Sequence, residues 1–248
     1  MGIRWPCSLP IPAGKGEHRR TADDRSESSQ RFTTVLTKEE LLAKAQKPAE
    51  EALRLHPLYR GKVQVAPKCP IHSVVDDFAV WYTPGVAAPC RAIQENPDLA
   101  YEYSSKSNTV AIVTDSTRVQ GLQVGFAERD IRAEAGLPLM EGKALLFKYL
   151  GGVDAVPLCL DMTDPERIID TVLALQPGFG GVNLEDISQP KCFRVLDRLR
   201  ELAEIPVWHD DQQGTATVTL AGVLNALKLV GKDIARARFT FVGSGAGN

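Results

Sequence analysis

Two short stretches decide the fold, Gly181-Val182-Asn183-Leu184-Glu185-Asp186-Ile187 and Trp208-His209-Asp210-Asp211-Gln212-Gln213-Gly214-Thr215. Each has the pattern of a short apolar strand that runs directly into carboxylates. Open α/β sheets bind their ligands at the carboxyl ends of their strands. The two stretches therefore predict a binding site at one edge of a sheet.

The acidic residues of these stretches indicate a metal site. We expect Glu185, Asp186 and Asp211 to converge from two neighbouring strand ends. Their oxygens are hard ligands that suit Mg²⁺ or Mn²⁺ and not a soft metal. Without a cation, the three carboxylates would repel one another and take up protons. The alternative interpretation is that they are helix caps and loop acids. Two such clusters, each at the end of a strand–helix unit, favour the metal.

The composition is that of a globular protein. The 248 residues are 44% hydrophobic and 24% charged, which suggests one large domain or two smaller ones. A net charge of -2 gives no support to nucleic-acid binding. No apolar run is long enough to span a bilayer, and the five scattered cysteines contain no C-x-x-C pair. We expect reduced thiols, a cytoplasmic location, and neither a membrane nor a nucleic-acid partner.

The N-terminal third is irregular at first and then helical. Residues 1–35 show no periodicity over most of their length and are expected to form a flexible tail. A capping box of Thr37 and Glu40 predicts a helix that runs toward Pro48, and a second helical stretch is expected over residues 49–55. The alternation within residues 61–69 favours a short strand.

Two residues of the next segments are candidates for function. The apolar run over residues 77–86 breaks at Thr-Pro-Gly and restarts as a helix, which leaves Tyr82 at the break. Packing with a solvated hydroxyl is the simpler interpretation of this tyrosine. A buried strand is predicted over residues 108–115, and Arg118 follows it in a strand-end loop. Its guanidinium could bind a carboxylate with two bonds, although a surface salt bridge is equally consistent.

The rest of the chain alternates strands and helices. The pattern predicts a mostly parallel sheet with flanking helices and right-handed crossovers. The expected strands cover residues 153–160, 181–184 and 206–208, and the expected helices cover 142–149, 164–175, 190–202 and 215–230.

The end of the chain suggests part of a second domain. A strand is predicted over residues 238–242, and Gly243 and Gly245 follow it as a G-x-G. This pattern opens the fingerprint of dinucleotide-binding domains, although the helix and the acidic residue that complete the fingerprint do not follow. We therefore interpret residues 216–248 as a linking helix and the first strand of a truncated NAD(P)-binding domain.

Together, several motifs resemble the bacterial and archaeal malic enzymes, the oxaloacetate-decarboxylating malate dehydrogenases. The resemblance runs in the family's order over about residues 50–245 and implies a substrate and metal domain over residues 36–215. The motifs are Trp81-Tyr82-Thr83-Pro84-Gly85-Val86-Ala87, Asn108-Thr109-Val110-Ala111, Met140-Glu141-Gly142-Lys143-Ala144-Leu145-Leu146-Phe147-Lys148, Asn183-Leu184-Glu185-Asp186-Ile187 and His209-Asp210-Asp211-Gln212-Gln213-Gly214-Thr215-Ala216.

The resemblance implies oxidative decarboxylation of malate to pyruvate and CO₂, with NAD or NADP and Mg²⁺ or Mn²⁺, in a homodimer or higher homo-oligomer. The implied roles are Tyr82 as catalytic tyrosine, Lys143 as catalytic lysine, Arg118 as ligand of a malate carboxylate, and Glu185, Asp186 and Asp211 as metal ligands. We expect Lys143 to have a lowered pKa, because it would lie near the cation and be partly desolvated. The sequence departs from the family in the long charged stretch over residues 123–133, which follows Arg118.

Other readings remain open at this point. The chain could be a non-catalytic, metal-binding and dimerising remnant of a malic enzyme, another metal-dependent decarboxylase, or a two-domain dehydrogenase of the amino-acid type. The last of these needs no cation, so the three acids Glu185, Asp186 and Asp211 argue against it. Because the nucleotide-binding pattern is incomplete, we expect the 248-residue chain not to catalyse NAD(P)-linked malate oxidation by itself.

Overall fold

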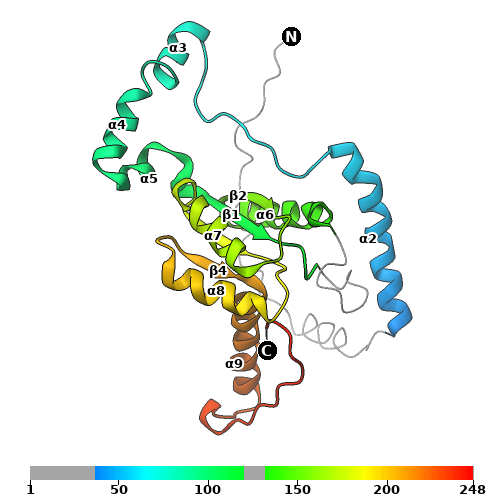
Figure 1. The fold of residues 1–248 in the computed structure, drawn as a ribbon. Helices are drawn as coiled ribbons and strands as arrows, with labels where there is room; N and C mark the ends of the chain where they lie inside the picture. Colours follow the sequence, from blue (N-terminus) through cyan, green and yellow to red (C-terminus); the bar gives the residue numbers. More distant parts are fainter. Residues whose placement is uncertain (1–36, 120–131, 248) are drawn as a thin grey trace, which may run out of the picture. The chain divides into compact units, whose positions relative to one another are not determined.

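The computed structural model describes residues 37–119 and 132–247 (Figure 1). The predicted tail over residues 1–35 and most of the charged stretch over 123–133 lie outside these ranges. The chain divides into two compact units, residues 1–55 and residues 56–248, and the second unit contains the sheet.

The predicted capping box at the start of the first described helix is confirmed. The backbone N–H of Thr37 donates to Glu40 Oε2 at 2.8 Å, and the N–H of Glu40 donates to Thr37 Oγ1 at 3.2 Å. The prediction of two separate helices was wrong, because one helix, α2 (Lys38–Tyr59), runs through Pro48. A proline removes one backbone donor from the ladder, and the remaining hydrogen bonds continue the helix on both sides of it.

The predicted strand over residues 61–69 does not form. Within the described ranges no strand pairs with this segment, and Val65 is fully exposed. A strand gains its hydrogen bonds from a neighbour, so alternation alone does not produce one. The segment leads instead to a series of short helices: α3 (Val74–Trp81), α4 (Ala87–Glu95), η1 (Pro97–Leu99), α5 (Ala100–Tyr103) and η2 (Ser105–Asn108).

The break between α3 and α4 lies where the sequence predicts it. The side chain of Ser73 caps the N-terminus of α3 by accepting from the N–H of Asp76, and Tyr82 caps its C-terminus. The N–H of Tyr82 donates to the carbonyl of Phe78 at 2.9 Å. The helix therefore ends directly before the Thr-Pro-Gly sequence, and α4 starts after it.

The core of the second unit is a parallel sheet, as predicted. Its strands lie in the order β2-β1-β3-β4, so the first strand in the sequence is central. All three pairings are parallel, and Ala111 of β1 lies between Val156 and Val182 of its neighbours. The strands are β1 (Thr109–Thr114), β2 (Asp154–Cys159), β3 (Gly181–Leu184) and β4 (Val207–His209).

Helices cover both faces of this sheet (Figure 1). Alternate residues of β1 point to opposite faces. Ile112 packs against Met140 and Ala144 on one face, whereas Ala111 and Val113 join the larger core cluster on the other. The first face is covered by α6 (Leu137–Gly151), which follows η3 (Ala133–Gly136), and the second by α7 (Pro165–Leu175) and α8 (Lys191–Leu202).

The strand order places the ends of β1 and β3 next to each other. The chain leaves β1 through α6 and reaches β2 on one side, and it then crosses through α7 to β3 on the other side. Right-handed crossovers in opposite directions place their helices on opposite faces. The helices that follow β1 and β3 therefore lie on opposite faces, and the loops that lead to them start side by side at the carboxyl edge, which is where open α/β sheets bind ligands.

The C-terminal part contains one long helix and no further strand. A π-helical turn, η5 (Asp210–Gly214), leads into α9 (Thr215–Leu229), and η6 (Ile234–Arg236) follows. The predicted strand over residues 238–242 was wrong, since no other described segment pairs with it and Val242 is 88% exposed. None of the helices in the described ranges has the length and apolar character needed to cross a membrane.

The packing of α8 gives a test of the core. Leu199 is completely buried in the larger cluster, whereas Leu202 on the same helix is 45% exposed. We expect Leu199→Ala to lower the free energy of unfolding by about 2–5 kcal/mol, because it removes buried methyl groups and leaves a cavity. Urea unfolding followed by circular dichroism measures this loss. Leu202→Ala is the control, and an equal loss in both variants would contradict the packing described.

Candidate metal centre

Three carboxylates converge at the carboxyl edge of the sheet. Glu185 and Asp186 follow β3 and are buried, and Asp211 follows β4 and is partly buried. One oxygen from each residue lies within 4.8 Å of the others. Oxygens that share one cation at about 2.1–2.4 Å cannot lie more than about 4.8 Å apart. The predicted convergence is therefore present, while the role of these residues as metal ligands stays a prediction.

The turn that carries Asp186 is held by its neighbours. Asp186 adopts a left-handed backbone with φ of 51°, a conformation that aspartate tolerates better than most residues. Its N–H donates to Asp211 Oδ2 at 2.9 Å, and its carbonyl accepts from the N–H of Arg118 at 2.9 Å. The unusual backbone is thus fixed by the loops that follow β1 and β4.

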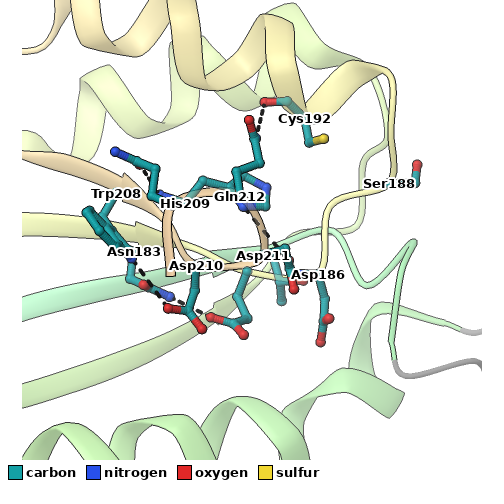
Figure 2. Close-up of polar contacts among 12 residues, drawn as sticks. Asn183, Asp186, Ser188, Cys192, Trp208, His209, Asp210, Asp211 and Gln212 are labelled. Atoms are coloured by element: carbon teal, nitrogen blue, oxygen red, sulfur yellow. Dashed lines mark hydrogen bonds and ion pairs between the residues drawn. The ribbon is translucent and has the colours of Figure 1, made fainter. Parts of the chain in front are cut away.

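The π-helical turn after β4 directs two adjacent aspartates to different partners (Figure 2). The N–H of His209 donates to Gln213 Oε1 at 2.8 Å, which closes the turn. A side chain at Gly214 would collide with Asp210 Oδ1, so any other residue there would displace the Asp210 carboxylate. In this turn Asp210 contacts Lys143, and Asp211 contacts the backbone of Asp186.

Lys143 lies between two carboxylates. Its Nζ is 2.8 Å from Asp210 Oδ2 and 3.1 Å from Glu185 Oε1, and its side chain is 23% exposed. The lowered pKa that we expect for Lys143 beside a cation stays a prediction. In the cation-free protein, burial lowers the pKa of Lys143, but the hydrogen bond that Lys143 donates to Asp210 and the charge of Glu185 outweigh burial and raise the pKa above its ordinary value.

Sequence reasoning missed two residues that hold this cluster. Asp210 is one of them, and its position directly before Asp211 was the available signal. The other is Asn183, which is 3% exposed and donates from Nδ2 to Glu185 Oε2 at 2.8 Å. A polar residue on a buried strand, two positions before Glu185 and thus on the same face, could have indicated this contact.

The electrostatics of the cluster fit a bound cation. Burial, together with the charges of Asp211 and Glu185, raises the pKa of Asp186 to about 7. Burial also raises the pKa of Glu185, although Asn183 and Lys143 partly offset this. Within the described ranges, no donor reaches the buried Oδ2 of Asp186. Three hard oxygen donors that repel one another, one of them without a partner, suit Mg²⁺ or Mn²⁺.

A histidine lies behind the carboxylates. His209 is completely buried, and its Nδ1 lies 3.8 Å from Asp211 Oδ2. Burial lowers its pKa, so the imidazole is neutral at pH 7.

The other two predicted catalytic and substrate-binding residues differ in their relation to this cluster. Arg118 is exposed, and its backbone is hydrogen-bonded to Asp186. Tyr82 is 67% exposed at the end of α3, and among the described residues no hydrogen bond joins its hydroxyl to Lys143 or to the three carboxylates. Among the described residues, Lys143 and Arg118 thus lie beside the carboxylates, and no contact joins Tyr82 to them.

One of the glycines at the end of the chain, Gly247, lies near the turn after β4. Gly243 has φ of 128°, and the space around Gly245 is open. A side chain at Gly247 would lie 2.7 Å from Thr215 Cγ2 and 3.1 Å from the carbonyl oxygen of Asp211. The glycine segment thus approaches the backbone of a predicted metal ligand closely.

Comparison with known proteins identifies the family of this site. Residues 60–167 match the family described as malic enzyme, N-terminal domain. The chain is 52% identical over 186 residues to the NAD-dependent malic enzyme of Geobacillus stearothermophilus, with 75% of this chain and 37% of that protein covered. It is 46% identical over 186 residues to the NADP-dependent malic enzyme of Escherichia coli, with 75% of this chain and 24% of that protein covered.

A solved structure agrees with this relationship. The malic enzyme of Entamoeba histolytica aligns with a TM-score of 0.78 and 48% identity, over 91% of this chain and 46% of that one. The chain thus spans less than half the length of these relatives. Motifs, fold and similarity agree, and the chain belongs to the malic enzyme family.

Proposed function

We propose that this chain supplies the substrate- and metal-binding residues of an enzyme that oxidises malate and decarboxylates the product to pyruvate and CO₂, with NAD or NADP and with Mg²⁺ or Mn²⁺. The observation that carries the proposal is the carboxylate triad with Lys143 Nζ 3.1 Å from Glu185. A metal-dependent proton transfer needs a cation site and a titratable group side by side, and this cluster supplies both. The names of the relatives, which include NAD- and NADP-dependent malic enzymes, support the nicotinamide.

Glu185, Asp186 and Asp211 are the residues that would hold the cation. When bound, the cation supplies a Lewis acid that acidifies the C2 hydroxyl of malate and stabilises the negative charge that develops on decarboxylation. The protein contributes three preorganised oxygens, which Asn183 and the backbone of Asp186 keep oriented. Asn183 donates to the oxygen of Glu185 that does not face Lys143, so both oxygens of this carboxylate are directed.

Lys143 is the residue that we assign to proton transfer at the C2 hydroxyl. Asp210 and Glu185 fix its Nζ from two sides, so the amine has one position relative to the carboxylates. It must be neutral to accept a proton, and the same two acids raise its pKa in the cation-free protein. A cation bound to Glu185 would reduce the negative charge beside Lys143 and so favour the neutral amine.

Arg118 and Tyr82 complete the proposed set. The guanidinium of Arg118 would bind a substrate carboxylate through two hydrogen bonds, from a loop whose backbone is tied to Asp186. Tyr82 would protonate C3 after CO₂ leaves. Its segment exposes several large apolar side chains, which supports burial in a homodimer or higher homo-oligomer: Val74, Val75, Phe78, Val80 and Trp81.

The C-terminal glycines belong to the proposed nicotinamide site. Gly243 and Gly245 would approach the cofactor phosphates, and the nicotinamide supplies the acceptor for the hydride from C2. The close approach of Gly247 to Asp211 supports a cofactor beside the cation. In this proposal residues 36–215 bind substrate and metal, residues 216–248 begin the nucleotide-binding part, and the protein acts in the cytoplasm.

Metal binding can be tested on the 248-residue chain. We expect the chain to bind Mn²⁺ and Asp211→Asn to weaken this binding at least tenfold, because the variant loses one of three charged ligands. Electron paramagnetic resonance of free Mn²⁺ measures the affinity. Asp170→Asn, which removes an exposed charge on α7, is the control. Equal affinities of the two variants would exclude the triad as the metal site.

The raised pKa of Asp186 gives a pH dependence. Below pH 7 the carboxyl holds a proton that the cation must displace, so Mn²⁺ affinity should fall by about tenfold per pH unit. Above pH 7 the carboxylate is ionised and the affinity should level off. Dissociation constants measured between pH 5.5 and 8.5 check this sign. An affinity that stays constant between pH 5.5 and 7 would contradict the assignment.

The role of Lys143 needs a complete nucleotide site. We suggest a chimera in which the C-terminal part of the Geobacillus stearothermophilus relative follows this chain. Lys143→Ala should reduce kcat for malate oxidation by about 10²–10⁴-fold, the usual contribution of a general base. Lys148→Ala, on the same helix and paired with Asp154, is the matched control. Absorbance of the reduced nicotinamide at 340 nm reports the rate, and a Lys143→Ala rate near that of the control would refute the role.

A further inference from the structure

Two hydrogen bonds join the loop after β1 to the loop after β3. The N–H of Arg118 donates to the carbonyl of Asp186 at 2.9 Å, and the N–H of Ser188 donates to Thr117 Oγ1 at 2.9 Å. Ser188 lies two residues beyond Asp186 in the same loop, and Figure 2 labels both residues. Thr117 and Arg118, which are adjacent in the loop after β1, thus bind two positions of the loop after β3. These contacts fix both the distance and the relative orientation of the two loops.

The hydroxyl of Thr117 is itself anchored. It donates to Asp115 Oδ1 at 2.7 Å, and the N–H of Thr117 donates to the same oxygen at 3.1 Å. The other oxygen of Asp115 lies 2.6 Å from Lys191 Nζ, in the first turn of α8. Asp115 is completely buried and Thr117 is 1% exposed. The contact between the loops is therefore supported by an ion pair that holds β1 to α8.

These contacts connect the proposed binding site of the substrate carboxylate to the proposed cation site. Arg118, next to Thr117, is the proposed ligand of a substrate carboxylate, and Asp186 is a proposed cation ligand. The positive charge of Arg118 already lowers the pKa of Asp186, against the larger effects of burial and the neighbouring acids. A shift of either loop would move one ligand relative to the other, so the geometry that suits both ligands depends on the contact between the loops.

We propose that Thr117 is a positioning residue that couples the binding of the divalent cation to the binding of a dicarboxylate substrate. The proposal rests on the proposed function, because it assumes the cation site and the role of Arg118. Without the hydroxyl, the N–H of Ser188 loses its acceptor, and of the two hydrogen bonds described above the one between Arg118 and Asp186 remains. The cation would then order only the loop of Asp186, and the substrate would order only the loop of Arg118. Coupling between sites is reciprocal, so it can be measured from either ligand.

The experiment measures Mn²⁺ affinity with and without L-malate. The 248-residue chain is titrated with Mn²⁺ by electron paramagnetic resonance, with correction for the complex that malate forms with free Mn²⁺, and no nicotinamide is present. In the wild-type chain we expect malate to tighten Mn²⁺ binding by about tenfold, within the usual range of coupling between sites. Thr117→Val keeps the shape, removes the hydroxyl and should reduce this ratio to less than about threefold.

Two further variants separate positioning from general stability. Thr117→Ser keeps the hydroxyl and should restore the wild-type ratio. Thr171→Val makes the same chemical change on α7, where the hydroxyl donates to the carbonyl of Arg167, and should leave the ratio unchanged. Circular dichroism checks that each variant is folded. Should Thr117→Val not fold, Thr117→Cys, which keeps the shape with a weak hydrogen-bonding group, takes its place in the comparison.

The outcomes distinguish this inference from the proposed function. A wild-type ratio in Thr117→Val or Thr117→Cys would overturn the inference, and so would a wild-type chain that binds Mn²⁺ without any effect of malate. Loss of the ratio in Thr117→Ser as well would also overturn it, because the hydroxyl is then not the cause. If the wild-type chain binds Mn²⁺ no better than Asp211→Asn does, it is the proposed function that fails.

Discussion

Repulsion among three acids is the constraint on which the site depends. Glu185, Asp186 and Asp211 lie close together, the first two buried and the third partly buried, and the ammonium of Lys143 contacts Glu185 directly. Such a cluster is costly unless it is neutralised by protons or by a metal. This electrostatic cost is the reason that hydrogen bonds from neighbouring residues surround the cluster. Asn183 orients one acid, the backbone of Asp186 holds another, and a left-handed residue and a π-helical turn bring the loops together.

Much of the fold could be predicted because its elements carry their signals locally. The β-branched run over residues 109–114, the cap of Asp164 followed by Pro165, and the apolar spacing of α8 each produce a regular element in any sheet of this type. Where the structure differs, the missing information was not local. Residues 61–69 and 238–242 have strand-like alternation, but a strand also needs a partner, and within the described ranges neither segment has one.

In the candidate site, too, features that depend on neighbours in the sequence could be predicted, and features that depend on the arrangement of the strands could not. That the acids follow strands could be predicted, and so could their convergence, because parallel strands end at one edge. The raised pKa of Lys143 in the cation-free protein could not be predicted. It depends on oxygens of Asp210 and Glu185 that lie 2.8 Å and 3.1 Å from Lys143 Nζ. The strand order was equally hidden, because the sequence of elements does not say on which side of β1 the third strand lies. That order places Arg118 beside Asp186.

The strand order also determines when the site can form. The contact of Thr117 with Ser188 joins residues 71 positions apart, and the chain between them includes α6, β2 and α7. Closing so long a loop costs entropy that is recovered only after the intervening elements have packed. The ligand loops therefore meet late in folding. A cation added to the unfolded chain has no preformed set of oxygens to bind, so it can stabilise the finished fold by mass action but cannot accelerate its nucleation.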